Sequence, residues 1–193
     1  MSRSMEAADH RGWARTFDAG SRLWEREVAG WVRDGAWRHH KRGDAQTTLF
    51  AEATSPDRIV GFISLSACLL DCSPQAPLVS ILRATGLPQP ARPDEIAGVH
   101  IVFLGVARGS QGRGIGTSIV ADLLADLAEG RFLAPRFLLL EVWTDSPAIG
   151  LYRRLGFVPL GEPVRDRIGW GVDGAEANLQ KMVLDRYSPV PGS

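Results

Sequence analysis

The chain has 193 residues, 45% of them hydrophobic and 23% charged, with 22 basic and 22 acidic side chains. This size and composition suit one soluble globular domain, residues 1–193, and leave little room for a second. The balanced charge argues against a protein that mainly coats nucleic acid. No apolar run is long enough to span a membrane, and the first residues lack the pattern of a signal peptide, so we expect a cytoplasmic protein.

The first elements expected along the chain are a helix and a hairpin. The helix begins at Ser21 and stops at Gly43. Apolar residues recur along one face of it at helical spacing: Trp24, Val28, Trp31 and Val32. Residues 47–53 and 58–67 then have the composition of strands, and the turn residues 54–58 join them into an antiparallel pair.

Residues 71–98 are rich in proline, glycine and alanine, with one short helix expected near 78–84. The segment is longer than a plain connection needs. It is expected to be either a flap on the substrate side or a mobile insertion. Cys68 and Cys72 lie just at its start, and because no further ligand pair is near them, we expect reduced cysteines and no metal.

The rest of the chain alternates strands and helices. In order, the expected elements are a strand at 98–106, a glycine loop, a helix that ends at Gly130, a strand at 136–143, a helix from Ser146 to Gly156, and strands at 157–160 and 179–185. This order predicts a single α/β (α+β) domain with a mixed central sheet flanked by helices. Its core spans about 17–187, and 188–193 form a tail.

The glycine loop is the densest motif of the chain. The run VARGSQGRGIGTSIV (106–120) holds four glycines between a strand and a helix. Free backbone N–H groups and the positive end of the helix dipole meet at such a point, and glycines let an anion approach closely. A P-loop is excluded because the run has no lysine, and a dinucleotide fingerprint has Thr117 where its third glycine belongs. The dinucleotide hypothesis stays open with Glu141 as its ribose-binding acid, as does a loop that binds nothing.

Two motifs together resemble the GNAT superfamily of N-acetyltransferases. Gln111, Gly114 and Gly116 match the superfamily's Q/R-x-x-G-x-G/A loop, which holds the pyrophosphate of acetyl-CoA. After one intervening strand, DSPAIGLYRRLGF is similar to its N-x-x-A-x-x-L-Y-x-x-x-G-F motif. The matching positions are Ala148, Leu151, Tyr152, Gly156 and Phe157. The resemblance implies a bulged strand before the loop that splays from its neighbour, with acetyl-CoA bound between them as co-substrate.

The resemblance also implies the binding residues. The backbone of Leu104 and Val106 would bind pantetheine and polarise the thioester carbonyl, as an oxyanion hole does. Asp145 replaces the superfamily's asparagine and would accept a hydrogen bond from pantetheine. The pyrophosphate would meet the loop and the first helical turn: Gln111, Gly112, Arg113, Gly114, Ile115, Gly116 and Thr117.

Tyr152 is the expected general acid. A tyrosine with a pKa near 10 can give a proton to a leaving thiolate whose thiol has a pKa of about 8.5. Glu141 and His100, on the strands beside the cleft, are the candidates for a general base, and each is equally a structural group. Because no strong base is evident, an α-amine with a pKa of about 7.7 suits the site better than a lysine amine near 10.4.

The first third of the chain is similar to one branch of the superfamily, the toxins that acetylate the α-amine of aminoacyl-tRNA. The similar stretches are FDAGSRLWEREVAGWVRDG, QTTLFAEA and IVGFISLSA. The branch has a cysteine where this chain has Ala19. Nine basic residues against six acidic ones precede Gly43, a flank that suits either phosphate contacts or a solvated helix face.

The expected function is therefore acetyl transfer from acetyl-CoA to a primary amine of a small molecule, peptide or aminoacyl-tRNA, with no metal and no membrane partner. A toxin that acetylates aminoacyl-tRNA, with an antitoxin partner, is the first alternative. A non-catalytic GNAT fold that binds acyl-CoA is the second. The oligomeric state stays open, a homodimer included.

Overall fold

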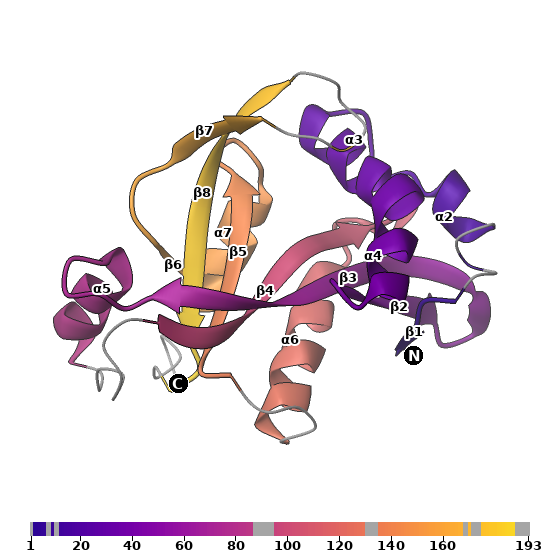
Figure 1. The fold of residues 1–193 in the computed structure, drawn as a ribbon. Coiled ribbons are helices and arrows are strands. Elements are labelled where there is room, and N and C mark those ends of the chain that lie inside the picture. The colour runs from indigo at the N-terminus through magenta and orange to yellow at the C-terminus, as the bar shows by residue number, and fades with distance from the viewer. Residues whose placement is uncertain are drawn as a thin grey trace.

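An eight-stranded mixed sheet forms the centre of the fold, in the order β1-β2-β3-β4-β5-β8-β6 with β7 paired to β8 (Figure 1). The computed structural model describes residues 2–6, 9, 12–86, 95–129, 135–167, 170 and 175–187. Among these residues β4 and β5 pair in parallel, and every other strand pair is antiparallel. The strands are β1 (Ser2–Ser4), β2 (Gln46–Glu52), β3 (Ser55–Asp71), β4 (Glu95–Val106), β5 (Phe137–Trp143), β6 (Val158–Pro159), β7 (Val164–Arg167) and β8 (Glu176–Asp185).

Helices cover both faces of this sheet. Because successive strand residues point to opposite faces, Phe62 and Ile63 of β3 belong to two different core clusters. The Ile63 face is covered by α6 (Ile115–Ala128) and α7 (Ala148–Arg154). The Phe62 face is covered by α2 (Trp13–Thr16), α3 (Leu23–Gly30), the π-helix η1 (Trp31–Ala36) and α4 (Trp37–Arg42). The predicted class, one mixed sheet flanked by helices, is confirmed.

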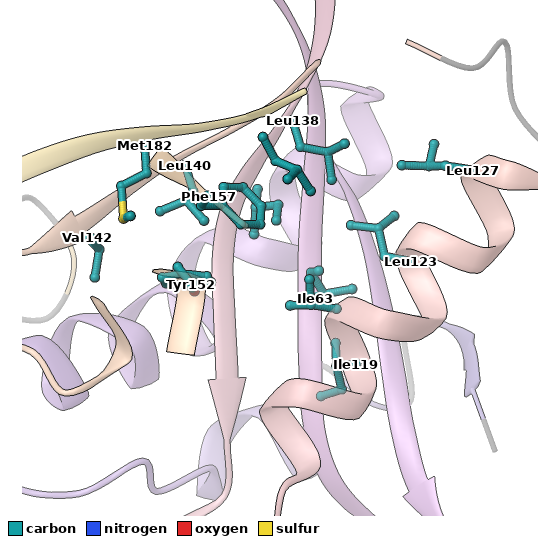
Figure 2. Packing of buried hydrophobic residues seen from close by; sticks show 13 residues of the cluster. Ile63, Ile119, Leu123, Leu127, Leu138, Leu140, Val142, Tyr152, Phe157 and Met182 are labelled. Atoms are coloured by element: carbon teal, nitrogen blue, oxygen red, sulfur yellow. The ribbon is translucent and has the colours of Figure 1, made fainter. Parts of the chain in front are cut away.

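The main core lies between α6, α7 and the middle of the sheet, as Figure 2 shows. Ile119, Leu123 and Leu127 follow one another at a spacing of four residues, so they form one stripe of α6. The stripe meets Leu138 and Leu140 of β5, all within a cluster whose members are 7% exposed or less. Each such buried side chain contributes about 1.5–3 kcal/mol by leaving water.

The N-terminal helix departs from the expected regular helix. It begins at Leu23 rather than Ser21, and it ends as predicted at Gly43, which adopts φ 76°. Between α3 and α4 the chain forms η1, a π-helical stretch that apolar spacing does not reveal. Gly35 lies within it, and a Cβ there would meet the rings of Trp31 and Trp170 at 2.7 and 2.8 Å.

The hairpin of β2 and β3 is confirmed, and β3 continues further than predicted. It pairs with β4 as far as Asp71 and Glu95. The two ends of the predicted segment 71–98 therefore belong to a pair of strands. The short helix expected near 78–84 is α5 (Pro77–Thr85), which packs against Phe137 and Val183. Among the described residues, none from α5 lines the cavity considered below.

Four short elements were not predicted from the sequence: β1, α2, the 3-10 helix η2 (Arg108–Ser110) and β7. Each has four residues or fewer, too short to show a periodic pattern. The predicted helix end at Gly130 and the tail 188–193 lie outside the described residues.

The strands β4 and β5 separate like the arms of a fork. They pair only from Gly98–Phe137 to Ile101–Leu140. In the pairing of β3 with β4, the register shifts between Ser64–Phe103 and Leu65–Ile101, which leaves Val102 as the extra residue of a bulge. Beyond it β4 stays with β3 while β5 stays with β8. The bulged, splayed strands that the resemblance implies are therefore present.

Candidate active site

A cavity of about 440 Å³ opens in the fork between β4 and β5. Leu104 and Val106 line its β4 wall, and Val142 and Trp143 line its β5 wall. The remaining walls come from α3, the glycine loop, the start of α7 and β7. The fork thus brings together segments that lie more than 100 residues apart.

The glycine loop leads directly into α6. Gly112 and Gly114 adopt φ 72° and 79°, which favour glycine, and a Cβ at either position would meet no atom within 4 Å. Gly114 is the N-cap, so no side-chain bond caps the first turn. The N–H groups of Ile115, Gly116 and Thr117 therefore point out of a helix end without a side-chain acceptor, which is the arrangement that suits a pyrophosphate.

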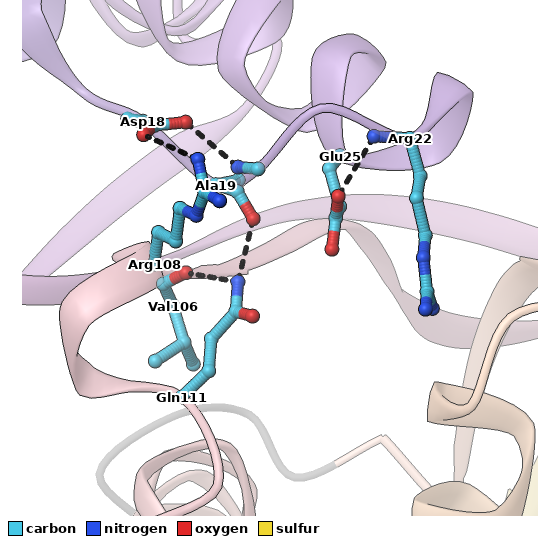
Figure 3. A network of polar contacts seen from close by, with 8 residues as sticks. Asp18, Ala19, Arg22, Glu25, Val106, Arg108 and Gln111 are labelled. Carbon is cyan, nitrogen blue, oxygen red and sulfur yellow. Dashed lines mark hydrogen bonds and ion pairs between the residues drawn. The ribbon is translucent and has the colours of Figure 1, made fainter.

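The side chain of Gln111 holds the loop in place. Its Nε2 donates to the carbonyl oxygens of Ala19 at 2.6 Å and Val106 at 3.1 Å, as Figure 3 shows. The loop is tied a second time by Arg108, whose guanidinium lies 3.9 Å from the Asp18 carboxylate. Gln111 was predicted to contact the pyrophosphate. In the structure its side-chain amide instead forms hydrogen bonds within the protein.

The other predicted pyrophosphate residues lie at the loop surface. Arg113 is exposed and lies 3.7 Å from the Glu52 carboxylate, a screened contact that leaves it free to turn toward a phosphate. Thr117 is exposed on the first turn of α6, while Ile115 packs partly into the main core. Gly116 lines the cavity.

Tyr152 lines the cavity from α7 and is 6% exposed. Its ring packs edge-on against Phe157, with ring centroids 5.6 Å apart. Burial raises the pKa of its phenol well above the ordinary value. Among the described residues no hydrogen-bond partner of its hydroxyl is found, although buried hydroxyls usually have one. The proton is thus held firmly on a group that faces the cavity.

The two candidate bases sit on either side of the fork's closed end. Glu141 of β5 lines the cavity and lies 3.4 Å from the ammonium of Lys181. His100 of β4 also lines it, and burial lowers the pKa of its imidazole below 6.5, which favours the neutral form at neutral pH. Asp145 is exposed in the turn before α7, and Ser146 and Pro147 line the cavity instead of it.

The outer half of the cavity was not predicted from the sequence. Glu27 of α3 is 9% exposed and accepts a hydrogen bond of 2.8 Å from the indole Nε1 of Trp143. Trp24 and Trp170 line the same region. On sequence alone Glu27 is a polar residue between apolar helix positions, and its partner is 116 positions away. No local pattern could have found it.

No three metal-ligating side chains gather within the part of the chain that the structure describes. The helices found there are also too short or too polar to cross a membrane.

Comparison with known proteins defines the class. The model of the acetyltransferase (GNAT) family matches residues 13–157, which include the fork, the glycine loop and Tyr152. The chain belongs to this family, whose members are N-acetyltransferases that depend on acetyl-CoA. No curated protein sequence matches it at a significant level.

Solved structures with the same fold include bacterial toxins. One crystal structure of a bacterial toxin is 24% identical with a TM-score of 0.65, and the match covers 96% of this chain and 90% of that one. AtaT complexed with acetyl-methionyl-tRNAfMet is 16% identical with a TM-score of 0.64, over 96% and 94% of the two chains. The spermidine/spermine N-acetyltransferase SpeG from Vibrio cholerae is 16% identical with a TM-score of 0.58, over 96% and 92%. At these identities the likeness concerns the fold.

Proposed function

We propose that this protein transfers the acetyl group of acetyl-CoA to the α-amine of an aminoacyl-tRNA. The glycine loop and the N-terminus of α6 bind the pyrophosphate through backbone N–H groups. The free edge of β4 near Leu104 and Val106 binds pantetheine, and an N–H there polarises the thioester carbonyl. Tyr152 donates the proton that the coenzyme A sulfur takes as the C–S bond breaks.

Two arginine–tryptophan stacks at the outer half of the cavity support aminoacyl-tRNA as the acceptor. The guanidinium of Arg22 lies 5.2 Å from the ring centroid of Trp24, and that of Arg38 lies 5.5 Å from the ring centroid of Trp170. Both tryptophans line the cavity, and both arginines are exposed. Neither guanidinium forms an ion pair with another described residue. A flat ring beside a free guanidinium suits the stacked bases and phosphates of a single-stranded RNA end.

The amine itself fits the chemistry of the site. An α-amine is partly neutral at neutral pH, so it can attack a thioester without a strong base. The two candidate bases are poorly placed to take a proton from the amine, because Glu141 is paired with Lys181 and His100 is half-buried. The full-length fold likeness to toxin structures, one of them with acetyl-methionyl-tRNAfMet, supports the same acceptor class.

A small cationic amine is the second candidate acceptor. Acidic side chains line the cavity at four positions: Glu25, Glu27, Glu141 and Asp166. Such a lining favours a ligand with several positive charges. The fold likeness to a spermidine/spermine N-acetyltransferase agrees with this candidate.

Labelled acetyl-CoA distinguishes the two acceptors. The purified protein is offered a charged tRNA pool, the same pool after deacylation, spermidine, and amino acid methyl esters. We expect label on charged tRNA and none on deacylated tRNA, and no label with Tyr152→Phe. Label on spermidine alone would replace the tRNA proposal with the second candidate.

The arginine stacks are tested in the same assay. Because base stacking contributes about 1–3 kcal/mol, the double variant Arg22→Ala and Arg38→Ala is expected to raise the KM for charged tRNA about tenfold or more and to weaken its salt dependence. The KM for an amino acid methyl ester should not change. Arg83→Ala, on α5 away from the cavity, is the matched control. An equal loss with both acceptors would contradict the role of the stacks in RNA binding.

A further inference from the structure

Glu27 is a buried carboxylate that joins the two arms of the fork. It projects from α3, which packs on β4, while its hydrogen-bond partner Trp143 ends β5. The bond between Glu27 Oε2 and the indole Nε1 measures 2.8 Å and is buried. The carboxylate therefore lies at the open end of the fork and lines the cavity there.

This carboxylate is buried beside another negative charge. Burial raises the pKa of Glu27, the hydrogen bond from Trp143 offsets part of this rise, and the nearby charge of Glu141 adds to it. Among the described residues no basic side chain forms an ion pair with Glu27. Lys181 pairs with Glu141 instead, and Arg26 of the same helix is exposed to solvent.

A structural role alone does not account for a charge at this position. A buried carboxylate with one hydrogen-bond donor is costly, whereas a glutamine carbonyl would accept the same indole bond without a buried charge. Costly ionisable groups in a cleft concentrate at functional sites. The missing counter-charge is thus expected from a ligand.

The rings around Glu27 suit a cation as well. Trp24 and Trp143 line the cavity with their ring centroids 6.1 Å apart and their planes tilted by 58°. An ammonium group beside Trp143 could contact the negative face of the indole and the carboxylate together.

We propose that Glu27 binds the acceptor amine in its ammonium form at the mouth of the fork, with Trp24 and Trp143 beside it, and that the ammonium gives its proton to solvent there before the neutral nitrogen attacks the thioester. This inference rests on the proposed acetyl transfer to an amine, but it does not depend on which amine is used. Glu27 is then the residue that selects an amine over a hydroxyl.

The variant Glu27→Gln tests this role, because it keeps the oxygen that accepts the Trp143 bond and removes only the charge. A hydrogen bond to a charged group contributes enough for about a 10- to 100-fold effect on binding. We therefore expect the KM for charged tRNA and for leucine methyl ester to rise about 10- to 100-fold. The dissociation constant for acetyl-CoA should stay at the wild-type value, and the melting temperature should not fall and should rise if the buried charge is costly.

Direct binding supplies a readout that needs no turnover. Leucine methyl ester and its hydroxy analogue, the methyl ester of 2-hydroxy-4-methylpentanoic acid, are titrated in the presence of CoA while tryptophan fluorescence is followed. The wild-type protein should prefer the amine, and Glu27→Gln should lose this preference. Asp34→Asn removes an exposed charge from the adjoining η1 and serves as the control.

The outcomes separate this inference from the proposed function. If the ester is acetylated and charged tRNA is not, the tRNA proposal fails and Glu27 is judged on the ester. If Glu27→Gln keeps the wild-type KM and the wild-type preference for the amine, Glu27 only ties α3 to β5 and the inference is wrong.

Discussion

Tyr152 joins two properties that seldom occur together, a buried phenol and a hydroxyl without a partner among the described residues. Burial raises its pKa, so the phenol is protonated at neutral pH and carries the proton that a leaving thiolate needs. The ring also belongs to the main core through Phe157. The same residue thus anchors α7 and faces the cavity.

Tyr152→Phe separates these two roles. It keeps the ring and removes only the hydroxyl, so the melting temperature should stay within the range of a neutral change. Loss of a general acid typically costs about 10²–10⁴-fold, and we expect a fall in kcat of this size. Release of the coenzyme A thiol measures kcat, and calorimetry measures the melting temperature. A variant with wild-type kcat would show that the sulfur takes its proton from elsewhere.

Residues at the site differed in how far sequence could predict them. Tyr152 and the glycines stand in contiguous motifs whose chemistry depends on local spacing. Glu27 has a role only because α3 folds across to Trp143, a contact between distant positions. Gln111 lies between these cases: its place in the loop was evident, but its bond to the Ala19 carbonyl joins residues 92 positions apart.

At the scale of elements, β4 carries the bulge that opens the fork, and α3 lies against it. The close packing depends on Gly105, where a Cβ would meet Phe62 at 2.3 Å and Val28 at 2.7 Å. Phe62 is fully buried, so it cannot move aside cheaply. The apolar composition of the strand predicted β4, and the family resemblance predicted its bulge. The contact of β4 with α3 became evident only from the structure.

Gly105→Ala should therefore strain the contact between α3 and β4. Overpacking of a core typically costs about 1–3 kcal/mol, and we expect a loss of unfolding free energy in this range. Denaturant titration measures it. Gly109→Ala is the matched control, because a Cβ there would meet no atom within 4 Å. Equal stability of both variants would mean that α3 shifts freely on β4.

At the scale of the molecule, the fork divides the sheet into a β1–β4 half and a β5–β8 half. Four residue pairs join the halves at the closed end. At the open end the Glu27–Trp143 bond and the contact of Trp170 with Trp31, whose ring centroids are 4.9 Å apart, span the gap. Acetyl-CoA in the fork would bridge both halves, so its binding should stabilise the whole fold.

Trp170→Ala tests whether the open end serves the acceptor alone. Trp170 follows β7 and packs on Trp31 and His39, away from the glycine loop. Acetyl-CoA at 100 times its dissociation constant should therefore add about 2.7 kcal/mol of stability to the variant and to the wild type alike. The KM for charged tRNA should rise about tenfold, because a stacking ring and the platform for Arg38 are lost.

Trp13→Ala provides the comparison, since Trp13 packs on Phe17 in the cluster around α2 and is not among the cavity-lining residues. Both tryptophan variants should lose stability by about 0.5–3 kcal/mol, the ordinary range for a lost packing contact. Only Trp170→Ala should change the KM for charged tRNA. If its KM stayed at the wild-type value, Trp170 would serve to hold the two halves together, and the acceptor would enter the fork without contacting it.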